Sequence, residues 1–310
     1  MIIKVKDLVK RYGTLTALDH LDLEIREGEI FGLLGPNGSG KTTAINCILS
    51  LLKFDQGTIE VFDRAMSPDA YDLKRDIGVV MQNVAVFEEL TVQDNIDYFC
   101  GLYITDRIQR QQLVEEAIDF VGLSDFRKFY PKKLSGGLLR RLNIACGIAH
   151  KPRLIILDEP TVAVDPQSRN NILEGIKRLN QGGATVLYTS HYMEEVEQIC
   201  SRITILDKGQ VIAMGTKEEL KGLISLGEKI TLEADNLDEA LLAELKSLHQ
   251  ISSVDYDNNV LVVRFAKGEN GLVDLLDFMK AKAVVLGRVY SELPTLNDVF
   301  LELTGKELRD

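Results

Sequence analysis

The chain has 310 residues and a net charge of −11, with 36 basic residues against 47 acidic ones. Its hydrophobic fraction of 45% excludes disorder as the main state. Apolar runs such as Leu154–Leu157 are far shorter than the ~20 residues of a membrane-spanning helix, and Lys4, Lys6 and Asp7 argue against a signal peptide. Acidic residues outnumber basic ones both before and after Lys229, so we expect no nucleic-acid partner.

Alternating strand-like and helix-like patterns over the first ~225 residues predict an α/β domain. The amphipathic stretch Gln109–Val121 predicts a helix, since its apolar residues recur at helical spacing. Short apolar runs predict buried strands at Ile30–Leu34, Leu154–Leu157, Thr185–Thr189 and Ile203–Leu206. The widely spaced cysteines predict buried, reduced thiols of a cytoplasmic protein; they are Cys47, Cys100, Cys146 and Cys200.

The pattern changes near Glu228, so we expect domains at 1–227 and 228–310. Strands are predicted at Lys229–Ala234, Ser253–Tyr256, Val260–Phe265 and Val284–Tyr290, with helices at Leu237–Leu248 and Gly271–Ala281. A last helix, capped by Thr295, is predicted through Leu303. The order β-α-β-β-α-β predicts a small α+β unit, a ferredoxin-like sandwich.

The segment Gly35–Thr42 fits the phosphate-loop pattern G-x-x-x-x-G-K-[ST], between a predicted strand and a predicted helix. Glycines allow the backbone N–H groups to turn toward phosphate oxygens, and the helix N-terminus adds its positive dipole end. Lys41 is expected to reach the β- and γ-phosphates, and Thr42 to offer its hydroxyl to magnesium.

A second signal is the buried strand Leu154–Leu157, which ends in two carboxylates. Ligands of parallel α/β sheets bind at this edge. We expect Asp158 to hold the magnesium shell and Glu159 to polarise the attacking water.

A third signal is Ser135-Gly136-Gly137 before an apolar helix, where a hydroxyl and exposed N–H groups offer another anion site. An ordinary capped helix is the alternative. Two phosphate sites in one chain are explained by a second copy: each ATP would lie between the Lys41 loop of one copy and the Ser135 loop of the other.

These motifs, in this order, resemble the ATP-binding subunits of ABC transporters, and the resemblance covers essentially the whole chain. Leu134–Gly137 resembles the family signature, with Leu138 where Gln or Met is usual. The resemblance implies a phosphate-loop ABC ATPase fold, with ATP and magnesium as ligands.

The resemblance also implies roles for single residues. Tyr12 is placed like the aromatic that stacks on adenine, and Gln82 like the glutamine joining the magnesium site to the transporter interface. Asp165 belongs to a loop that resembles the one touching the opposite protomer, with Ala163 where Gly is common. His191 resembles the histidine that contacts the γ-phosphate. By itself, Tyr12 fits a half-buried turn residue equally well. A lone glutamine such as Gln82 is more often a surface amide, and a lone histidine such as His191 is more often structural than catalytic.

The predicted catalytic residues are therefore Glu159, His191 and Gln82, and the predicted metal-site residues are Thr42, Gln82 and Asp158. The predicted nucleotide-binding residues are Tyr12, Gly35, Asn37, Gly38, Ser39, Gly40, Lys41, Thr42, Thr43, Ser135, Gly136, Gly137 and Asp165.

Two segments, Ser190–Glu195 and Pro294–Phe300, resemble the drug- and antibiotic-exporter branch of the family. This implies an ATPase that drives a separate transmembrane permease from the cytoplasmic face of the membrane. Two alternatives stay open: a soluble ABC ATPase acting on the ribosome or DNA, and an importer ATPase with a ligand-sensing C-terminal domain.

Overall fold

The computed structural model describes residues 1–235, 237–248, 250–267 and 271–305. It divides into two compact units, one over Met1–Thr216 and one that begins at Lys217. Within the described residues, no helix is long and apolar enough to cross a bilayer. The predicted domain limits, 1–227 and 228–310, stay a prediction; in the structure, helix α8 (Lys217–Gly222) packs with α11 (Leu296–Thr304) in the C-terminal unit.

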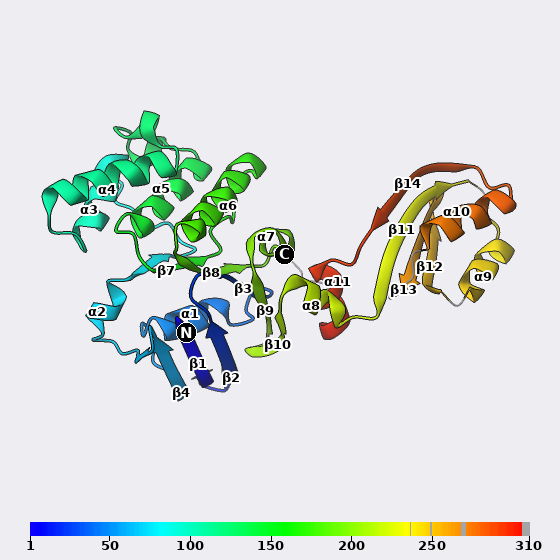
Figure 1. The fold of residues 1–310 in the computed structure, drawn as a ribbon, viewed down its shortest axis with the longest axis horizontal. Helices are drawn as coiled ribbons and strands as arrows, with labels where there is room; N and C mark the ends of the chain where they lie inside the picture. Colours follow the sequence, from blue (N-terminus) through cyan, green and yellow to red (C-terminus); the bar gives the residue numbers. More distant parts are fainter. Residues whose placement is uncertain (236, 249, 268–270, 306–310) are drawn as a thin grey trace. The chain divides into compact units, whose positions relative to one another are not determined.

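The N-terminal unit contains two sheets and a group of helices (Figure 1). Its strands are β1 (Ile3–Tyr12), β2 (Leu15–Ile25), β3 (Ile30–Leu34), β4 (Gln56–Val61), β5 (Arg64–Ala65), β6 (Ile77–Val80), β7 (Leu154–Asp158), β8 (Thr185–Ser190), β9 (Arg202–Asp207) and β10 (Gln210–Gly215). Its α-helices are α1 (Lys41–Ile48), α2 (Tyr71–Lys74), α3 (Val92–Gly101), α4 (Arg107–Phe120), α5 (Gly136–Ile148), α6 (Pro166–Gln181) and α7 (Met193–Ile199).

The larger sheet has the order β10-β9-β3-β8-β7-β6, and all its strands except β10 run parallel. In the ladders, Val80 pairs with Leu157, Asp158 with Thr189, and Leu34 with Ser190. The carboxyl ends of β3, β6, β7 and β8 therefore meet at one edge. The phosphate loop, Gln82, Glu159 and His191 all follow these strand ends, which is where ligands of parallel sheets bind.

The second sheet, β2-β1-β4-β5, is antiparallel. Buried side chains of this sheet, of β3 and of α1 share one core, which includes Ile3, Leu23, Phe31, Ala44 and Ile48. Complete burial of such side chains stabilises each by about 1.5–3 kcal/mol. This core fixes α1 against β3 and so fixes the loop between them.

Helices α3, α4 and α5 pack together in the segment between β6 and β7 (Figure 1). Each begins at a polar cap: Thr91, Asp106 and Ser135 accept a hydrogen bond from a backbone N–H of the first turn. Such caps stabilise a helix by about 1 kcal/mol each. The predicted helix Gln109–Val121 corresponds to α4.

His150 lies just beyond α5, stacked on Tyr103 with ring centroids 3.9 Å apart. Burial lowers the pKa of His150 to about 4. In the unfolded chain His150 binds a proton below about pH 6.5, whereas in the folded chain it does so only near pH 4. The folded state therefore loses stability as the pH falls from about 6.5 to about 4. We expect the wild type to lose about 2 kcal/mol more unfolding free energy than His150→Phe between pH 7.5 and pH 5. Urea unfolding at both pH values measures this difference, and identical losses in the two proteins would contradict it.

After α8, the C-terminal unit has the element order that the sequence predicts, β-α-β-β-α-β. Its elements are β11 (Leu226–Ala234), α9 (Glu239–Ser247), β12 (Ile251–Asp257), β13 (Val260–Ala266), α10 (Leu272–Ala281) and β14 (Leu286–Glu292), followed by α11. The sheet order is β12-β13-β11-β14, with antiparallel neighbours. Helices α9 and α10 lie on one face of this sheet (Figure 1), above a core that includes Leu232, Val263 and Met279.

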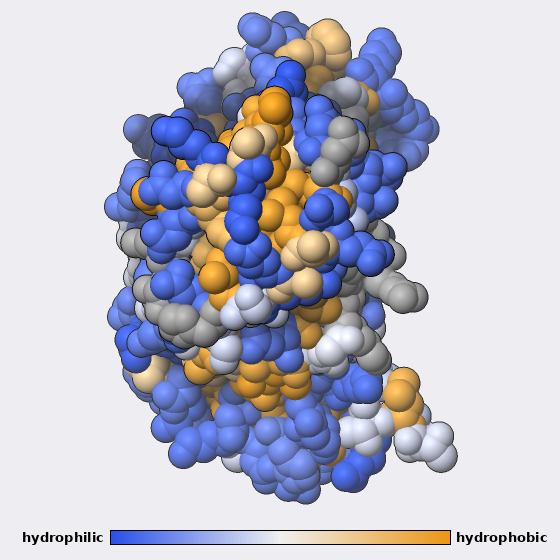
Figure 2. Space-filling model, turned by 90° about the vertical axis from the view of Figure 1, so that its right-hand side faces the viewer, coloured by the Kyte–Doolittle hydropathy of each residue, from blue (hydrophilic) through white to orange (hydrophobic). Residues whose placement is uncertain are grey.

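The edge strand β14 is largely exposed, and Tyr290 within it is 54% exposed. Val285 and Leu293, beside this strand, are 74% exposed each. Apolar surface is visible among hydrophilic side chains in Figure 2.

All four cysteines are buried and unbridged, which confirms the predicted reduced thiols.

Candidate active site

The phosphate loop joins β3 to α1 and has a conformation that requires glycine. Gly40, at φ 109°, is the N-cap of α1, and a Cβ there would lie 2.8 Å from the Ala17 carbonyl oxygen. The Ser39 N–H donates to the Pro36 carbonyl, and the Ser39 carbonyl accepts from Gly209 N–H at 2.9 Å. The loop is thus held from within and by the β9–β10 turn, with the N-terminus of α1 available to an anion.

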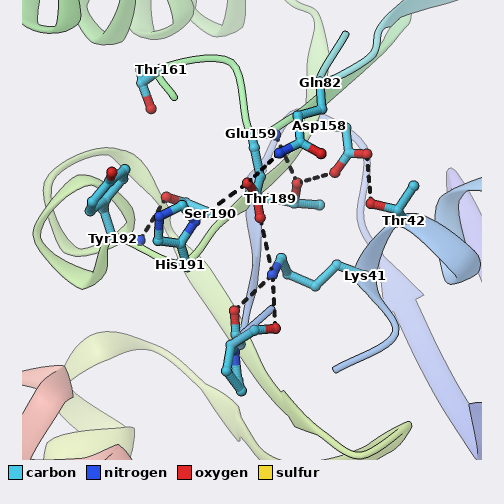
Figure 3. Close-up of polar contacts among 12 residues, drawn as sticks. Lys41, Thr42, Gln82, Asp158, Glu159, Thr161, Thr189, Ser190, His191 and Tyr192 are labelled. Carbon is cyan, nitrogen blue, oxygen red and sulfur yellow. Dashed lines mark hydrogen bonds and ion pairs between the residues drawn. The ribbon is translucent and has the colours of Figure 1, made fainter. Parts of the chain in front are cut away.

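Lys41 folds back over the phosphate loop (Figure 3). Its ammonium donates to the carbonyl oxygens of Gly35 at 2.8 Å and Pro36 at 3.2 Å, and it lies 3.1 Å from Glu159 Oε1. The Lys41 and Glu159 side chains are only 4% and 6% exposed. In such a poorly solvated place the charges interact more strongly than in water, so a phosphate entering the cleft competes with Glu159 for Lys41.

Asp158, at the end of β7, is completely buried and accepts two hydroxyl hydrogen bonds. Its Oδ2 accepts from Thr42 Oγ1 at 2.8 Å, and its Oδ1 accepts from Thr189 Oγ1 at 2.6 Å. This carboxylate therefore links α1, β7 and β8. Glu159 follows at φ 47°, an uncommon conformation for a residue with a Cβ.

Gln82 and His191 both approach the Glu159 carboxylate (Figure 3). Gln82 Nε2 donates to Glu159 Oε2 at 3.2 Å, and His191 Nδ1 lies 3.3 Å from the same oxygen. The other two predicted catalytic side chains therefore converge on the Glu159 carboxylate, which Lys41 contacts through its other oxygen.

A cleft of about 560 Å³ opens beside these residues, within the ~300–1,000 Å³ range of ligand pockets. Its lining includes these predicted site residues: Tyr12, Asn37, Gly38, Gly40, Lys41, Thr42, Thr43, Gln82 and Glu159. It also includes Leu15, Thr16, Ala17 and Lys208, which the sequence motifs did not indicate. Tyr12 is 49% exposed, and Lys10 Nζ lies over its ring, 4.9 Å from the ring centroid.

Magnesium fits the oxygen donors beside this cleft. Thr42 Oγ1 and Asp158 Oδ2 lie 2.8 Å apart. Gln82 donates to Glu159 through its amide nitrogen, so this bond does not use the amide oxygen, which is the atom that could bind a metal. Mg²⁺ prefers hard oxygen ligands and is usually held by one or two carboxylates together with substrate phosphates.

The signature loop lies apart from this cleft, since Ser135, Gly136 and Gly137 are not among its lining residues. Ser135 is the exposed N-cap of α5, and its Oγ accepts from Leu138 N–H at 3.3 Å. This bond uses the backbone N–H of Leu138, so it does not depend on the leucine side chain that stands where the family usually has Gln or Met.

Asp165 lies beside the signature loop. It caps α6 by accepting from Ser168 N–H at 2.9 Å, a bond that lowers the pKa of Asp165. A Cβ at Gly137 would lie 2.5 Å from Ser168 Oγ, so glycine permits this close packing. In the same loop Ala163 has φ 59°, a conformation that favours glycine. The predicted binding residues therefore fall on two surfaces of one chain.

Arg140 is a residue of the site that the sequence motifs did not reveal. It lies on α5, only 3% exposed. Its guanidinium donates to five backbone carbonyl groups, those of Met81, Gln82, Asp158, Glu159 and Pro160. Burial lowers the pKa of Arg140. In the sequence it is indistinguishable from its neighbour Arg141.

Glu195 is a second such residue, 3% exposed, on α7. Its Oε2 accepts from Tyr188 OH at 2.6 Å, Thr161 Oγ1 at 2.8 Å and Ser190 Oγ at 3.0 Å. Arg169 Nε lies 3.2 Å from its other oxygen. Glu195 thus joins α7, which follows His191, to the end of β8, which precedes it. In the sequence, Glu195 looks like any acidic residue in the first turn of a helix.

The parallel sheet, its phosphate loop and the carboxylate pair at one edge define a phosphate-loop nucleotide-binding enzyme. Residues 18–162 match the family model described as ABC transporter. The chain is 38% identical to the linearmycin resistance ATP-binding protein LnrL of Bacillus subtilis, over all of both chains. It therefore belongs to the ABC transporter family, as one of its ATP-binding proteins, and it is an ATPase.

Two further relatives are similar over nearly their whole length. The daunorubicin/doxorubicin resistance ATP-binding protein DrrA of Streptomyces peucetius is 36% identical over 99% of this chain and 94% of its own. A Nod factor export ATP-binding protein I of Ralstonia nicotianae is 33% identical over 100% of this chain and 95% of its own.

Among solved structures, the ATP-binding subunit of an ABC transporter matches with a TM-score of 0.66 and 25% identity, covering 72% of this chain and 93% of its own. A dimeric ATP-binding cassette in a post-hydrolysis state, bound to ADP and phosphate, matches with a TM-score of 0.64 and 28% identity. It covers 69% of this chain and 98% of its own. These matches confirm the predicted ABC ATPase fold.

Proposed function

We propose that this chain is the ATPase subunit of an export system for a drug, an antibiotic or a related compound. It drives a separate transmembrane permease from the cytoplasmic face of the membrane. Relatives that match over nearly their whole length carry names of resistance and export proteins, which support export over an importer or a ribosome- or DNA-acting ATPase. The observation that carries the proposal is a cleft lined by Lys41, Gln82 and Glu159 on one surface, with an exposed signature loop outside its lining.

Two copies of the chain would combine these two surfaces. Ser135 and Gly136 are exposed at the N-terminus of the 13-residue helix α5, whose N–H groups favour an anion. In a sandwich, the signature loop of one copy contacts the γ-phosphate held by Lys41 of the other. The dimeric cassette among the solved relatives supports this arrangement. ATP is then required for closure, because both surfaces bind the same phosphate.

The residues around Glu159 can perform hydrolysis. When ATP enters, Lys41 exchanges Glu159 for the β- and γ-phosphates, which releases the carboxylate to accept a proton from the attacking water. Gln82 and His191 hold this carboxylate and the water between them, and His191 offsets charge on the γ-phosphate. Magnesium, held by Thr42, Asp158 and Gln82, would neutralise phosphate charge in this cleft.

A permease-docking surface is expected next to Gln82. The segment after Gln82 presents Phe87, 43% exposed, which packs on Tyr98 of α3 with ring centroids 4.9 Å apart. The completely buried Asn95 fixes this segment, since its side chain bonds both the N–H and the carbonyl of Phe87. An exposed aromatic pair whose Phe87 lies five residues after Gln82 is suited to an apolar partner segment.

Affinity purification from detergent-solubilised membranes tests this proposal. Wild-type protein should retain one integral membrane protein in stoichiometric amount. Phe87→Asp should lose it while keeping ATP binding, because the cleft is not lined by Phe87. Ile212→Asp is the matched control, since Ile212 is 37% exposed on β10, at the opposite edge of the sheet from β6. Recovery of no membrane protein with the wild type would overturn the permease assignment.

A further inference from the structure

We propose that Arg140 is a positioning residue for hydrolysis. It fixes the backbone at Gln82 and Glu159 and ties both to α5, the helix that follows the signature loop. One part of this inference, that the signature loop contacts the ATP of a partner copy, rests on the proposed function. Arg140 itself does not line the cleft; it acts through the main chain of Gln82 and Glu159, which do.

The Arg140 guanidinium bonds the main chain after two neighbouring strands. Its Nη1 donates to the carbonyls of Gln82 at 2.7 Å and Met81 at 3.1 Å. Its Nη2 donates to those of Glu159 at 2.6 Å and Asp158 at 3.3 Å, while Nε donates to Pro160 at 2.7 Å. The two strand ends β6 and β7 are thus held at a fixed separation by one planar group. Because the fork of an arginine is rigid, lysine cannot reproduce these contacts.

Burial of the Arg140 charge has an energetic cost. A charged side chain that is 3% exposed loses its hydration, which is expensive unless every donor is satisfied. An apolar residue would fill the same space at lower cost, so packing alone does not explain an arginine here. The five carbonyl groups belong to consecutive residues around Gln82 and Glu159, and this points to the placement of these two side chains.

Helix α5 connects Arg140 to the signature loop. Arg140 lies five residues after Ser135, within the first turns of α5. Gly137, between them, packs directly on Ser168 at the start of α6. A displacement of α5 must therefore move the carbonyl groups of Gln82 and Glu159 or break their bonds to Arg140. A nucleotide bound at the signature loop is in this way mechanically connected to the hydrolytic residues of the same copy.

The test compares Arg140→Gln and Arg140→Lys with Arg141→Gln. Arg141 is a matched control, because it is the next residue on α5 and does not line the cleft. Within the described part of the chain, its guanidinium donates to the Val121 carbonyl alone, at 3.1 Å. ATP affinity, kcat and KM are measured for the full-length chain with Mg²⁺, together with the thermal transition.

We expect Arg140→Gln to lower kcat about 100-fold, the effect of misplacing reacting groups by about 1 Å, with ATP affinity within about threefold of the wild type because Lys41 and Tyr12 are unchanged. Arg140→Lys should also lose kcat, and Arg141→Gln should not. A general loss of structure would lower affinity and the thermal transition together, whereas positioning lowers kcat alone.

Wild-type kcat in folded Arg140→Gln would overturn the inference, as would equal losses of affinity and kcat. If Arg140→Gln does not fold, Arg140→Lys decides by the same criteria. The two-copy arrangement has a separate test: it fails if Glu159→Gln forms no ATP-bound dimer. The result for Arg140 does not depend on that test, because kcat and affinity are compared between variants of one chain.

Discussion

Replacing Glu159 with glutamine is expected to slow ATP hydrolysis by about 1,000-fold, within the range of a lost general base, and to leave an ATP-bound dimer that persists. Glutamine keeps the shape of the side chain and an oxygen for Lys41, so the cleft stays intact. It cannot accept the proton of the attacking water. Removing the negative charge also removes repulsion toward the γ-phosphate, which favours the closed state. Light scattering on a sizing column, with ATP and Mg²⁺ present, measures the dimer directly.

The control for this variant is Glu194→Gln, which removes the same charge from an exposed position beside the His191 loop. It should hydrolyse ATP at the wild-type rate and remain monomeric once ATP is consumed. Glu159→Gln that stays monomeric with saturating ATP would refute the sandwich. Glu159→Gln with wild-type hydrolysis would remove Glu159 from the reaction and leave the dimer question to be answered separately.

Lys41→Ala is expected to weaken ATP binding by about 100-fold, since charge-assisted hydrogen bonds contribute roughly 1.5–3 kcal/mol each. The loss has two sources. The phosphates lose a cation that reaches them, and Glu159, which is 6% exposed, loses its ion-pair partner. Its uncompensated charge then repels the γ-phosphate. Isothermal titration with ATP and Mg²⁺ measures the affinity without depending on hydrolysis.

Lys6→Ala provides the matched control, because Lys6 is an exposed lysine of β1 that does not line the cleft. It should bind ATP as the wild type does. The thermal transition of Lys41→Ala must be measured as well, so that loss of binding is separated from loss of folding. Unchanged ATP affinity in folded Lys41→Ala would show that the cleft binds phosphate by its backbone alone.

The sequence predicts the buried strands well, because four or five consecutive apolar residues fit a sheet that is covered on both faces. Ile30–Leu34 is the observed β3, and Leu154–Leu157 differs from β7 only by Asp158. Element ends are less well predicted where pairing decides them. Strand β11 begins at Leu226, before the predicted Lys229, because Leu226 pairs with Ala266 on β13.

The buried polar residues show why part of the site could not be predicted. Arg140 and Arg141 are adjacent and identical in type, yet Arg140 bonds carbonyl groups about 20 and 60 residues away in the chain. Glu195 resembles any acid in the first turn of a helix, although it joins Thr161, Ser190 and Arg169. Such roles depend on long-range packing, which leaves no periodic pattern in the sequence.

What the sequence by itself determined is the local chemistry: a phosphate loop, a strand ending in Asp158 and Glu159, and a Ser-Gly-Gly helix start. Each of these is a short run of neighbouring residues whose backbone conformation follows from its own glycines, caps and apolar residues. Only the tertiary structure decided that Gln82 and His191 meet at the Glu159 carboxylate. It also agrees with the expectation that Ser135 lies outside the lining of the cleft that contains Lys41. The physical reason is that parallel pairing brings the carboxyl ends of distant strands to one edge, while α5 carries the signature loop on a separate surface.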